Sequence, residues 1–540
     1  MCHFKNLFIS IRENLFNINL FLFFCIFLFL SNFCYSQYKY DFRVNDDAAL
    51  KYQNAAKLDV DTAGNFVVVW QDQRNMSGPF HPSYDIYCQR FNYKGEPQGN
   101  NFKINLHDSS AYVPNIIMRK DGSFIVAWQE GVYVGQYVDS IKYVMRIYNK
   151  YGIPISNLKT INDSIFTCPI HEPPAIGISN QNKIYAIMTM IQGQYGENHI
   201  YLQILDSLGN KIGVNEMVND NIPFKIQDYP DISMRKDGSF IIVWQDSRYG
   251  SGDIFMQKYN SGGQKIENNI KVNDDPIDPN IVHGEPSISS DTTGNFCIVW
   301  DDSRESSGSY INIYCQKYDT AFNLIGSNFR VNQGSIWERG NATIKKRNDG
   351  YFIVGWSDYW ANGQGWCPYF QRFSNLYNFI GTQHWITTYN PSQAKYLEDM
   401  TLWGDRIISV WRDWRNGNGD IFCNIRSFQY PDSIISNLTQ INNIIPEDFK
   451  VFQNFPNPFN SNSKIKIQIS KSEVSIQNSE VRIVIYNVIG KEITTLLNQK
   501  LLPGIYEINF DGNNLSTGLY FCSLIVDGVR IDTKKLILLK

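Results

Sequence analysis

The chain has 540 residues and a formal net charge of −3, with 14% aromatic and 19% charged residues. This length allows several ordinary domains, or one large repeat domain followed by a smaller one. The aromatic-rich composition favours packed β-structure over disorder. Because the charge is near neutral and no Lys/Arg run occurs, the chain lacks the basic face that nucleic-acid binding requires, and we expect no nucleic-acid partner.

The N-terminus has the pattern of a targeting segment. Basic residues precede an apolar run of 11 residues from Leu20 to Leu30. This run suits the core of a signal peptide and is short for a bilayer-spanning helix. The small residue Ser36 predicts cleavage after position 36, so residues 1–36 are expected to be a signal peptide and the mature chain to have no membrane span. An uncleaved anchor and lipidation at Cys34 are the alternatives.

A β-hairpin pattern then recurs seven times. Its clearest copy, Lys236 to Tyr259, has an Asp-Gly turn, an apolar run ending in Trp244, a polar loop with Asp246 and Arg248, and a second strand-like run. The anchoring residue recurs at spacings of 55 to 60 residues, which indicates a radial or linear array of β-units. The anchors are Trp70, Trp128, Met188, Trp244, Trp300, Trp356 and Trp411.

Each repeat also has a short strand of small residues before the hairpin and a fourth strand after it. Small residues suit the crowded centre of a radial array, so we predict an all-β fold with a seven-bladed β-propeller of four-stranded blades at residues 37–430. Asp41 to Asn45 looks like a fourth strand without a repeat of its own, whereas the seventh repeat lacks one. This N-terminal strand should therefore complete the last blade and remove the exposed edges that a bent open array would leave.

The Asp-x-x-Gly-x-Phe and Trp-x-Asp-x-Arg patterns resemble the repeats of TolB-like periplasmic propellers and, more faintly, the Asp-box turns of sialidase-type propellers. Such short resemblances imply fold and not function. The repeated Asp/Arg pairs, such as Asp246 and Arg248, could ring one face and bind an anion. Because the pair recurs in most blades, we instead expect each Arg to pin its loop by bridging its own Asp and the aspartate that opens the next strand, such as Asp253.

Seven cysteines remain after removal of the signal peptide, so they cannot all pair within the chain. Cys88, Cys315 and Cys423 occupy equivalent positions in the repeats, which predicts buried apolar fillers. A bridge between Cys297 and Cys315 within one hairpin stays open. No Cys/His group has zinc spacing, and we expect no metal site of that kind.

The last part of the chain has a different pattern. Residues 431–447 are rich in Ser, Asn and Ile and are expected to be a linker, and residues 448–540 contain strand-like runs separated by Gly and Pro turns, which predicts a small Ig-like β-sandwich. Five motifs occur there in order: Asn-x-Pro-Asn-Pro-Phe-Asn from Asn454, Ile-Tyr-Asn-Val-Ile-Gly-Lys-Glu (485–492), Leu-Pro-Gly-Ile-Tyr (502–506), Leu-Ser-Thr-Gly-Leu-Tyr-Phe (515–521) and a terminal Lys-Lys-Leu-Ile-Leu-Leu-Lys.

In this order the motifs resemble the type IX secretion system (Por) C-terminal sorting domain, type A, of Bacteroidetes-type bacteria, apart from a polar insertion at Lys471 to Glu480. The resemblance implies export through the inner membrane by way of the signal peptide. It also implies that the type IX translocon recognises residues 448–540, and that the protein reaches the outer cell surface or the medium. Release and surface attachment both remain open.

Residues just before each short inner strand are expected to line the mouth of the central channel, and they differ between blades. The candidate ligand-binding residues there are Glu172, Asp228, Tyr229, Glu285, Trp337, Arg339 and Glu398. Carboxylates, an arginine and aromatic rings together could bind a glycan by stacking and hydrogen bonding. The alternative is that they only solvate the channel mouth.

We assign no catalytic residues, since no nucleophile elbow, phosphate-binding Gly loop or HExxH motif occurs. The expected function is a non-enzymatic ligand-binding, adhesion or scaffold module for an extracellular glycan or surface protein. The alternative is a secreted polysaccharide-active enzyme, either a glycoside hydrolase or a lyase, that uses carboxylates at the mouth. We expect no cofactor; Asn-Asp turns such as Asn45-Asp46-Asp47 could hold calcium, although turn capping also explains them.

Overall fold

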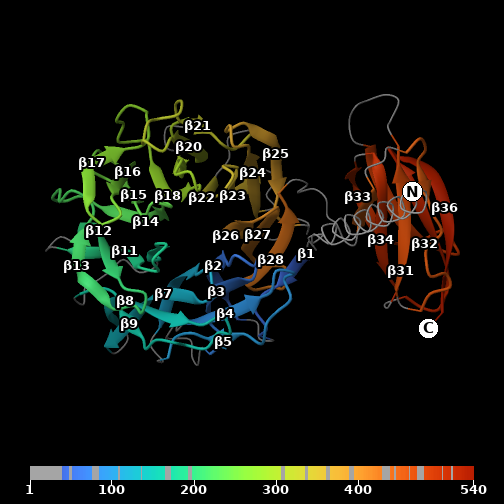
Figure 1. The fold of residues 1–540 in the computed structure, drawn as a ribbon, viewed down its shortest axis with the longest axis horizontal. Coiled ribbons are helices and arrows are strands. Elements are labelled where there is room, and N and C mark those ends of the chain that lie inside the picture. The colour runs from blue at the N-terminus through green and yellow to red at the C-terminus, as the bar shows by residue number, and fades with distance from the viewer. Residues whose placement is uncertain are drawn as a thin grey trace, which may run out of the picture. The chain divides into compact units, whose positions relative to one another are not determined.

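The computed structural model describes residues 39–47, 51–75, 84–106, 110–134, 137–163, 172–192, 197–305, 310–334, 339–360, 365–387, 394–428, 438–442, 446–460, 462–470, 479–501, 503–512 and 515–539. These residues form strands β1 to β36 and no helix (Figure 1). They divide into two compact units, Tyr38–Ile434 and a second that contains Ile435–Lys540. Within the described residues, no helical segment has the length and hydropathy needed to span a bilayer.

The first unit is a ring of seven four-stranded antiparallel sheets, which confirms the predicted seven-bladed β-propeller. Figure 1 shows first strands such as β2, β14 and β22 toward the centre of the ring and fourth strands such as β13, β17 and β25 at its edge.

Blades are numbered here in chain order, and the first strand of each is called its inner strand. Blades 1 to 3 consist of β2 (Gln53–Val60), β3 (Phe66–Asp72), β4 (Asp85–Phe91) and β5 (Phe102–Lys103); β6 (Ala111–Met118), β7 (Phe124–Val134), β8 (Tyr137–Tyr148) and β9 (Lys159–Thr160); β10 (Ala175–Ile178), β11 (Ile184–Gln192), β12 (Glu197–Leu205) and β13 (Lys211–Met217).

Blades 4 to 6 repeat this order, and blade 7 takes its fourth strand from the N-terminus. Their strands are β14 (Gln227–Met234), β15 (Phe240–Asp246), β16 (Asp253–Tyr259) and β17 (Lys265–Lys271); β18 (His283–Ser290), β19 (Phe296–Asp302), β20 (Asn312–Tyr318) and β21 (Phe329–Arg330); β22 (Arg339–Lys346), β23 (Phe352–Trp360), β24 (Gly365–Phe373) and β25 (Phe379–Trp385); β26 (Lys395–Trp403), β27 (Arg406–Asp413), β28 (Asp420–Ser427) and β1 (Lys39–Arg43).

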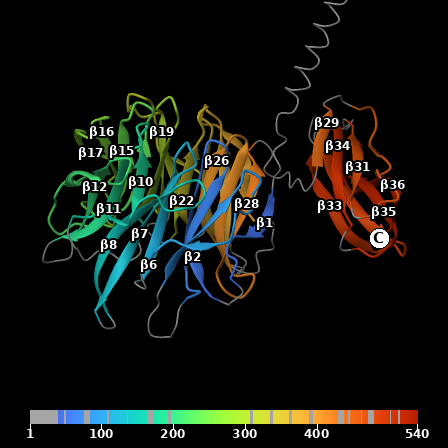
Figure 2. The same cartoon turned by 60° about the horizontal axis from the view of Figure 1, so that its bottom comes forward.

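The N-terminal strand closes the ring as predicted. Strand β1 pairs antiparallel with β28, with Phe42 opposite Cys423 (Figure 2). The pairing continues past the strand, where Val44 N donates to Ile421 O at 2.8 Å. Asn45 is 3% exposed, and its side chain accepts from Ile421 N at 2.9 Å. The last blade therefore combines strands from the N-terminal and C-terminal ends of the propeller, and no sheet edge is left unpaired between blades 7 and 1.

The cores lie between blades and explain the repeat. In the described part of the chain, seven clusters of buried apolar side chains each draw on two neighbouring blades, including a cluster between blades 7 and 1 that contains Trp70 and Ile421. The six anchoring tryptophans are fully buried. A buried indole N–H needs an acceptor. For five of the six tryptophans the aspartate two residues later supplies it, as where Trp244 Nε1 donates to Asp246 Oδ2 at 2.9 Å. Trp128 is followed by Glu130 at this position. The Trp-x-Asp spacing therefore has a structural cause.

The Asp/Arg pairs are structural, but one expected partner is wrong. Arg248 donates from Nη2 to Asp246 Oδ2 at 2.7 Å and from Nη1 to Asp220 Oδ2 at 3.0 Å. Asp220 belongs to the turn after blade 3, so each arginine clasps two neighbouring blades, and two further blades repeat this arrangement. The predicted bridge to Asp253 does not form, because the turn from the preceding blade lies closer to the guanidinium.

The described cysteines are all buried, and none of them forms a disulfide. Cys88, Cys315 and Cys423 are each 0% exposed, which confirms their role as apolar fillers. The thiols of Cys297 and Cys315 lie in hydrogen-bonding contact without a disulfide between them.

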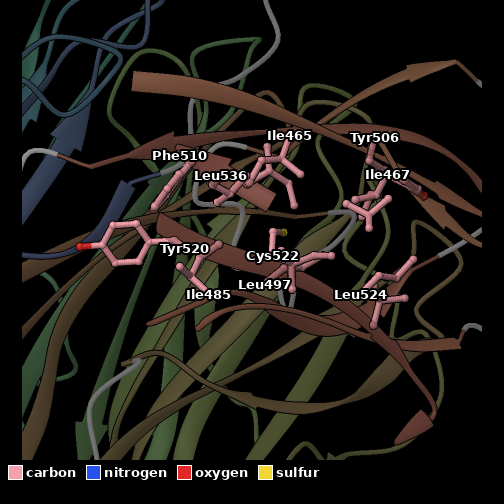
Figure 3. Close-up of a cluster of buried hydrophobic side chains, with 14 of the residues drawn as sticks. Ile465, Ile467, Ile485, Leu497, Tyr506, Phe510, Tyr520, Cys522, Leu524 and Leu536 are labelled. Carbon is pink, nitrogen blue, oxygen red and sulfur yellow. The ribbon is translucent and has the colours of Figure 1, made fainter. Parts of the chain in front are cut away.

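The second unit is a small β-sandwich, as predicted. Its sheets run β29-β34-β31-β30 and β33-β32-β35-β36. Side chains of both sheets, including Ile465 and Phe510 from one and Ile485 and Leu524 from the other, form a common core (Figure 3). The strands are β29 (Leu438–Asn442), β30 (Lys450–Val451), β31 (Asn462–Ile469), β32 (Ser479–Asn487), β33 (Glu492–Leu501), β34 (Gly504–Asp511), β35 (Gly518–Val526) and β36 (Val529–Leu538). Strand β29 lies within the stretch expected to be a linker and pairs with β34.

Candidate functional site at the propeller mouth

The mouth is the face on which the inner strands begin and on which the second and third strands of each blade are joined. Near it, the register of the inner strand shifts in six blades of the described chain, which marks a β-bulge. Five of the residues at this bulge have positive φ: Ala55 (51°), Val113 (41°), Tyr229 (53°), Glu285 (48°) and Asn341 (59°). Such a backbone costs about 1–3 kcal/mol per residue and re-aims the side chain. Two predicted site residues, Tyr229 and Glu285, thus owe their direction to the bulge.

Side chains from the preceding blade hold the bulges by accepting their N–H groups. Gln71 Oε1 accepts from Val113 N at 2.6 Å, and Ser357 Oγ accepts from Leu397 N at 2.9 Å. Both acceptors follow an anchoring Trp directly in sequence. Asp301 Oδ2 accepts from Asn341 N in the same way at 3.3 Å, so the side chain at this position holds the bulge of the next blade in three blades.

Between blades 3 and 4, Glu172 accepts the N–H of the bulge. Its carboxyl lies in hydrogen-bonding contact with the Tyr229 N–H and with the Asp228 carboxyl. Glu172 is 6% exposed, and its Oε2 receives no N–H or O–H donor of good geometry. Burial and the charge of Asp228 raise the pKa of Glu172 to about 8. Burial raises the pKa of Asp228 as well, while Asn198 Nδ2 donates to its Oδ1 at 2.5 Å.

Two touching carboxyls cannot both be ionised without strong repulsion. The pair therefore shares one proton at neutral pH, with Glu172 as the acid and Asp228 as the carboxylate. Such a pair can donate a hydrogen bond from one oxygen and accept one at another, and it can in principle transfer a proton.

A second group of carboxyls lies beside this pair. Burial raises the pKa of Tyr229 to about 12, with further contributions from the charges of Glu285, Glu172 and Asp228, so these four side chains share one neighbourhood. Burial raises the pKa of Glu285, which the charge of Lys57 opposes. Burial and the charge of Glu285 hold the pKa of the neighbouring Asp301 well above its ordinary value.

Glu398 also lies near Lys57, whose ammonium donates to its backbone oxygen at 3.3 Å. Its carboxyl contacts the backbone N–H groups of Ala55 and Ala56, and burial raises its pKa against the opposing charges of Arg412 and Lys57. Arg412 Nε lies 3.3 Å from Glu398 Oε1. Arg412 follows an anchoring Trp directly, but its guanidinium has no acceptor and cannot bind the N–H groups of the bulge. Glu398 accepts these N–H groups instead, and Arg412 remains at the mouth.

The remaining two predicted residues stand apart. Arg339 is 3% exposed and donates from Nε to Asp358 Oδ2 at 2.9 Å and from Nη1 to Asn312 Oδ1 at 3.0 Å. Its part in ligand binding stays a prediction, and its guanidinium is engaged within the fold. Trp337 lies outside the described residues.

Sequence reasoning missed Lys57, Asp301, Arg412 and the aromatic rings around Arg412. The available signal was the residue after the anchoring Trp, which changes from Gln71 and Gln245 to Asp301 and Arg412. That signal was hidden because the surrounding Trp-x-Asp-x-Arg motif repeats for structural reasons.

Deeper in the ring, Lys345 is surrounded by charge from three inner strands. Burial disfavours its ammonium, but the charges of Asp399, Asp231 and Asp59 raise its pKa above the ordinary value. Each of these aspartates accepts a backbone N–H from the inner strand of the next blade. These carboxylates therefore tie the blades together around the axis.

The Asn-Asp turns are already occupied by protein donors. Asp46 Oδ1 accepts from Arg74 Nη1 at 2.7 Å, and Asp47 Oδ1 accepts from Asn45 Nδ2 at 2.7 Å. Among the described side chains, no three of His, Cys, Asp or Glu gather as ligands for a metal ion. Calcium binding at these turns stays a prediction.

Solved structures of similar fold include a protein of unknown function from Dyadobacter fermentans, with 9% identity over 72% of this chain and 97% of that one (TM-score 0.42). Another is a GH93 α-L-arabinofuranosidase of Fusarium graminearum in complex with arabinobiose, with 10% identity over 60% and 94% of the two chains (TM-score 0.41). A third is polysaccharide lyase Uly1, with 8% identity over 68% and 90% (TM-score 0.42). At this identity the likeness concerns the fold alone. No curated protein matches the chain.

The second unit is matched by a family model. Residues 453–539 match the secretion system C-terminal sorting domain. This match covers strands β31 to β36 of the sandwich and the motifs from Asn454 onward. The C-terminal unit is thus a type IX sorting domain, and the chain is a cargo of that secretion system, exported to the outer cell surface or the medium.

Proposed function

We propose that the propeller is a ligand-binding module whose mouth binds an extracellular glycan. One observation carries this proposal: polar side chains that differ from blade to blade converge at the mouth, whereas the side chains that the fold requires repeat around the ring. The converging groups include the proton-sharing pair Glu172 and Asp228, the half-exposed Tyr229 and the cation Lys57.

These groups supply what a sugar needs. Sugar hydroxyls both donate and accept, and the Glu172–Asp228 pair offers a donor and an acceptor side by side. Tyr229 is 39% exposed, so its ring can stack on the apolar face of a sugar. Export places the module where extracellular glycans occur.

The test is a glycan array probed with the chain from residue 37 onward. We expect binding to a defined set of glycans and a loss of about tenfold in affinity for Tyr229→Ala. Tyr151→Ala is the matched control, because Tyr151 is 64% exposed on a turn at the opposite face. No binding to any glycan, or equal binding by both variants, would contradict the proposal.

A second candidate is catalysis, favoured by the single proton that Glu172 and Asp228 share. Retaining and inverting glycosidases usually hold their two carboxyls about 5–5.5 Å and about 6.5–9.5 Å apart, respectively. Carboxyls in hydrogen-bonding contact match neither separation, which supports binding over that chemistry for this pair. An assay for reducing ends released from array-positive glycans tests it: turnover that Glu172→Gln and Asp228→Asn both abolish would replace the binding proposal.

A further inference from the structure

We propose that a row of aromatic rings beside Arg412 forms a track for several consecutive sugars of a linear polysaccharide. This inference rests on the glycan-binding function proposed above and gives it a ligand class. The row, called here the aromatic track, consists of Tyr52, Trp414, Tyr396, Trp366 and Tyr359. It crosses the mouth face from blade 1 through blade 7 to blade 6.

The rings follow one another without a gap. Ring centroids are 6.2 Å apart for Tyr52 and Trp414, 5.5 Å for Trp414 and Tyr396, and 5.2 Å for Tyr396 and Trp366. Tyr359 extends the row at 5.6 Å from Trp366.

The fold does not require these rings. Trp414 stands three residues after the anchoring Trp411, the offset at which other blades carry Gln73, Ser247 and Ser303. Tyr396 stands where two other inner strands have Gly284 and Gly340. Blade 2 also has an aromatic residue, Tyr112, at the position of Tyr396. Since other blades have small or polar residues at both positions, closing the ring does not require aromatic side chains there.

The rings are also not part of a core. The anchoring Trp411 is fully buried, whereas Trp414, three residues later, is partly exposed, and Tyr359 is 37% exposed. Aromatic surface left in water in a contiguous row marks an interaction site rather than a packing solution. Polysaccharides present apolar ring faces and hydroxyl edges in a regular series, which a row of Tyr and Trp rings can stack against and hydrogen-bond.

Arg412 holds the track in place. Its guanidinium carbon lies 4.9 Å from the ring centroids of both Tyr396 and Trp414, and its Nη1 donates to the Tyr52 hydroxyl. Glu398 anchors the guanidinium from behind. Rings fixed before binding lose little conformational freedom when a sugar stacks on them, so more of the contact free energy appears as affinity.

The experiment uses the chain from residue 37 onward with named probes. Affinity electrophoresis in gels containing xylan, arabinan, galactan, alginate or pectate selects a polymer, and calorimetry then compares its dimer with its hexamer. We expect the hexamer to bind at least about tenfold more tightly than the dimer, and Trp414→Ala and Trp366→Ala each to weaken hexamer binding by about tenfold or more. Trp414→Phe should retain most of the affinity, because a ring remains.

The outcomes separate the two proposals. Two results would overturn the inference and leave the glycan function intact. In the first, a polymer binds but its dimer binds as tightly as its hexamer. In the second, the Trp variants bind with the affinity of the parent and only their melting temperatures fall, which would mean that the aromatic track supports the loops. If none of the five polymers and no array glycan binds, the glycan function fails, and the track fails with it. The control Tyr151→Ala should leave both readouts unchanged.

Discussion

Replacing Glu172 with Gln should remove a pH-dependent penalty on folding of the propeller. Burial and the adjacent Asp228 raise the pKa of Glu172 from an ordinary 4.5 to about 8. Between these two pH values the folded chain holds a proton that the unfolded chain releases. The free energy of unfolding therefore falls as the pH rises through this window and levels off above it.

The magnitude follows from the shift. Each unit of pKa difference corresponds to about 1.4 kcal/mol, so the penalty at pH 9 is on the order of 4–5 kcal/mol. Gln is neutral at every pH and can donate from its amide to Asp228, as protonated Glu172 does. The Glu172→Gln variant should thus match the parent near pH 5 to within about 1 kcal/mol and exceed it by several kcal/mol at pH 9.

Urea unfolding followed by tryptophan fluorescence at pH 5, 7 and 9 measures this difference. All twelve tryptophans lie between positions 70 and 414, so the signal reports the propeller and not the sorting domain. The control is Glu216→Gln, at an exposed position on β13. Parallel pH profiles for the parent and Glu172→Gln would refute the shared proton and, with it, the assignment of Glu172 as the acid of the pair.

Three further substitutions test the fold. Asp246→Ala leaves the buried Trp244 N–H without its acceptor and the Arg248 guanidinium without its nearest carboxylate; the free energy of unfolding should fall by about 3–5 kcal/mol, measured in urea. Asn45→Ala removes the side-chain contacts that tie the N-terminal strand to blade 7 and should cost about 2–3 kcal/mol and speed proteolysis near β1. His283→Gln should lower the melting temperature more at pH 6 than at pH 9: the hydrogen bond to Asp275 raises the pKa of His283 against the effect of burial, so its charge stabilises the fold at low pH and is lost as the pH rises through that pKa.

Each of these has a contradicting result. An Asp246→Ala loss below about 1 kcal/mol would mean that water replaces the carboxylate. Unchanged proteolysis of Asn45→Ala would mean that backbone pairing alone holds β1. Equal melting shifts for His283→Gln at both pH values would mean that the imidazole is neutral in the folded protein.

Much of the fold was predictable because its physical causes act within short stretches of sequence or recur in every repeat. The Trp anchors at 55 to 60 residue spacing, the small inner strands and the unpaired Asp41–Asn45 segment each had one good explanation, and the propeller with its N-terminal closing strand follows from them. In the sandwich, β29 lies within residues 431–447, which were expected to be a linker. Its pairing with β34, which is distant in sequence, decides its structure.

The candidate site was only partly predictable. Inner-strand position pointed to Glu172, Asp228, Tyr229 and Glu285, and the structure gathers these four. The same rule included Arg339, whose guanidinium turns into the fold toward Asp358. Position along a strand indicates the end of the ring at which a residue lies, but the partners within reach decide where a long side chain points.

The sequence by itself determined the architecture, the closing strand and the export signal at the C-terminus, since hydrophobic periodicity and turn residues act over short stretches of chain. Tertiary structure alone decided that Glu172 touches Asp228, that Arg248 clasps Asp220, and that Arg412 lies among aromatic rings. These contacts join residues from different blades or from opposite ends of a repeat. Their protonation and orientation follow from burial and neighbouring charge, which exist only once the ring has closed.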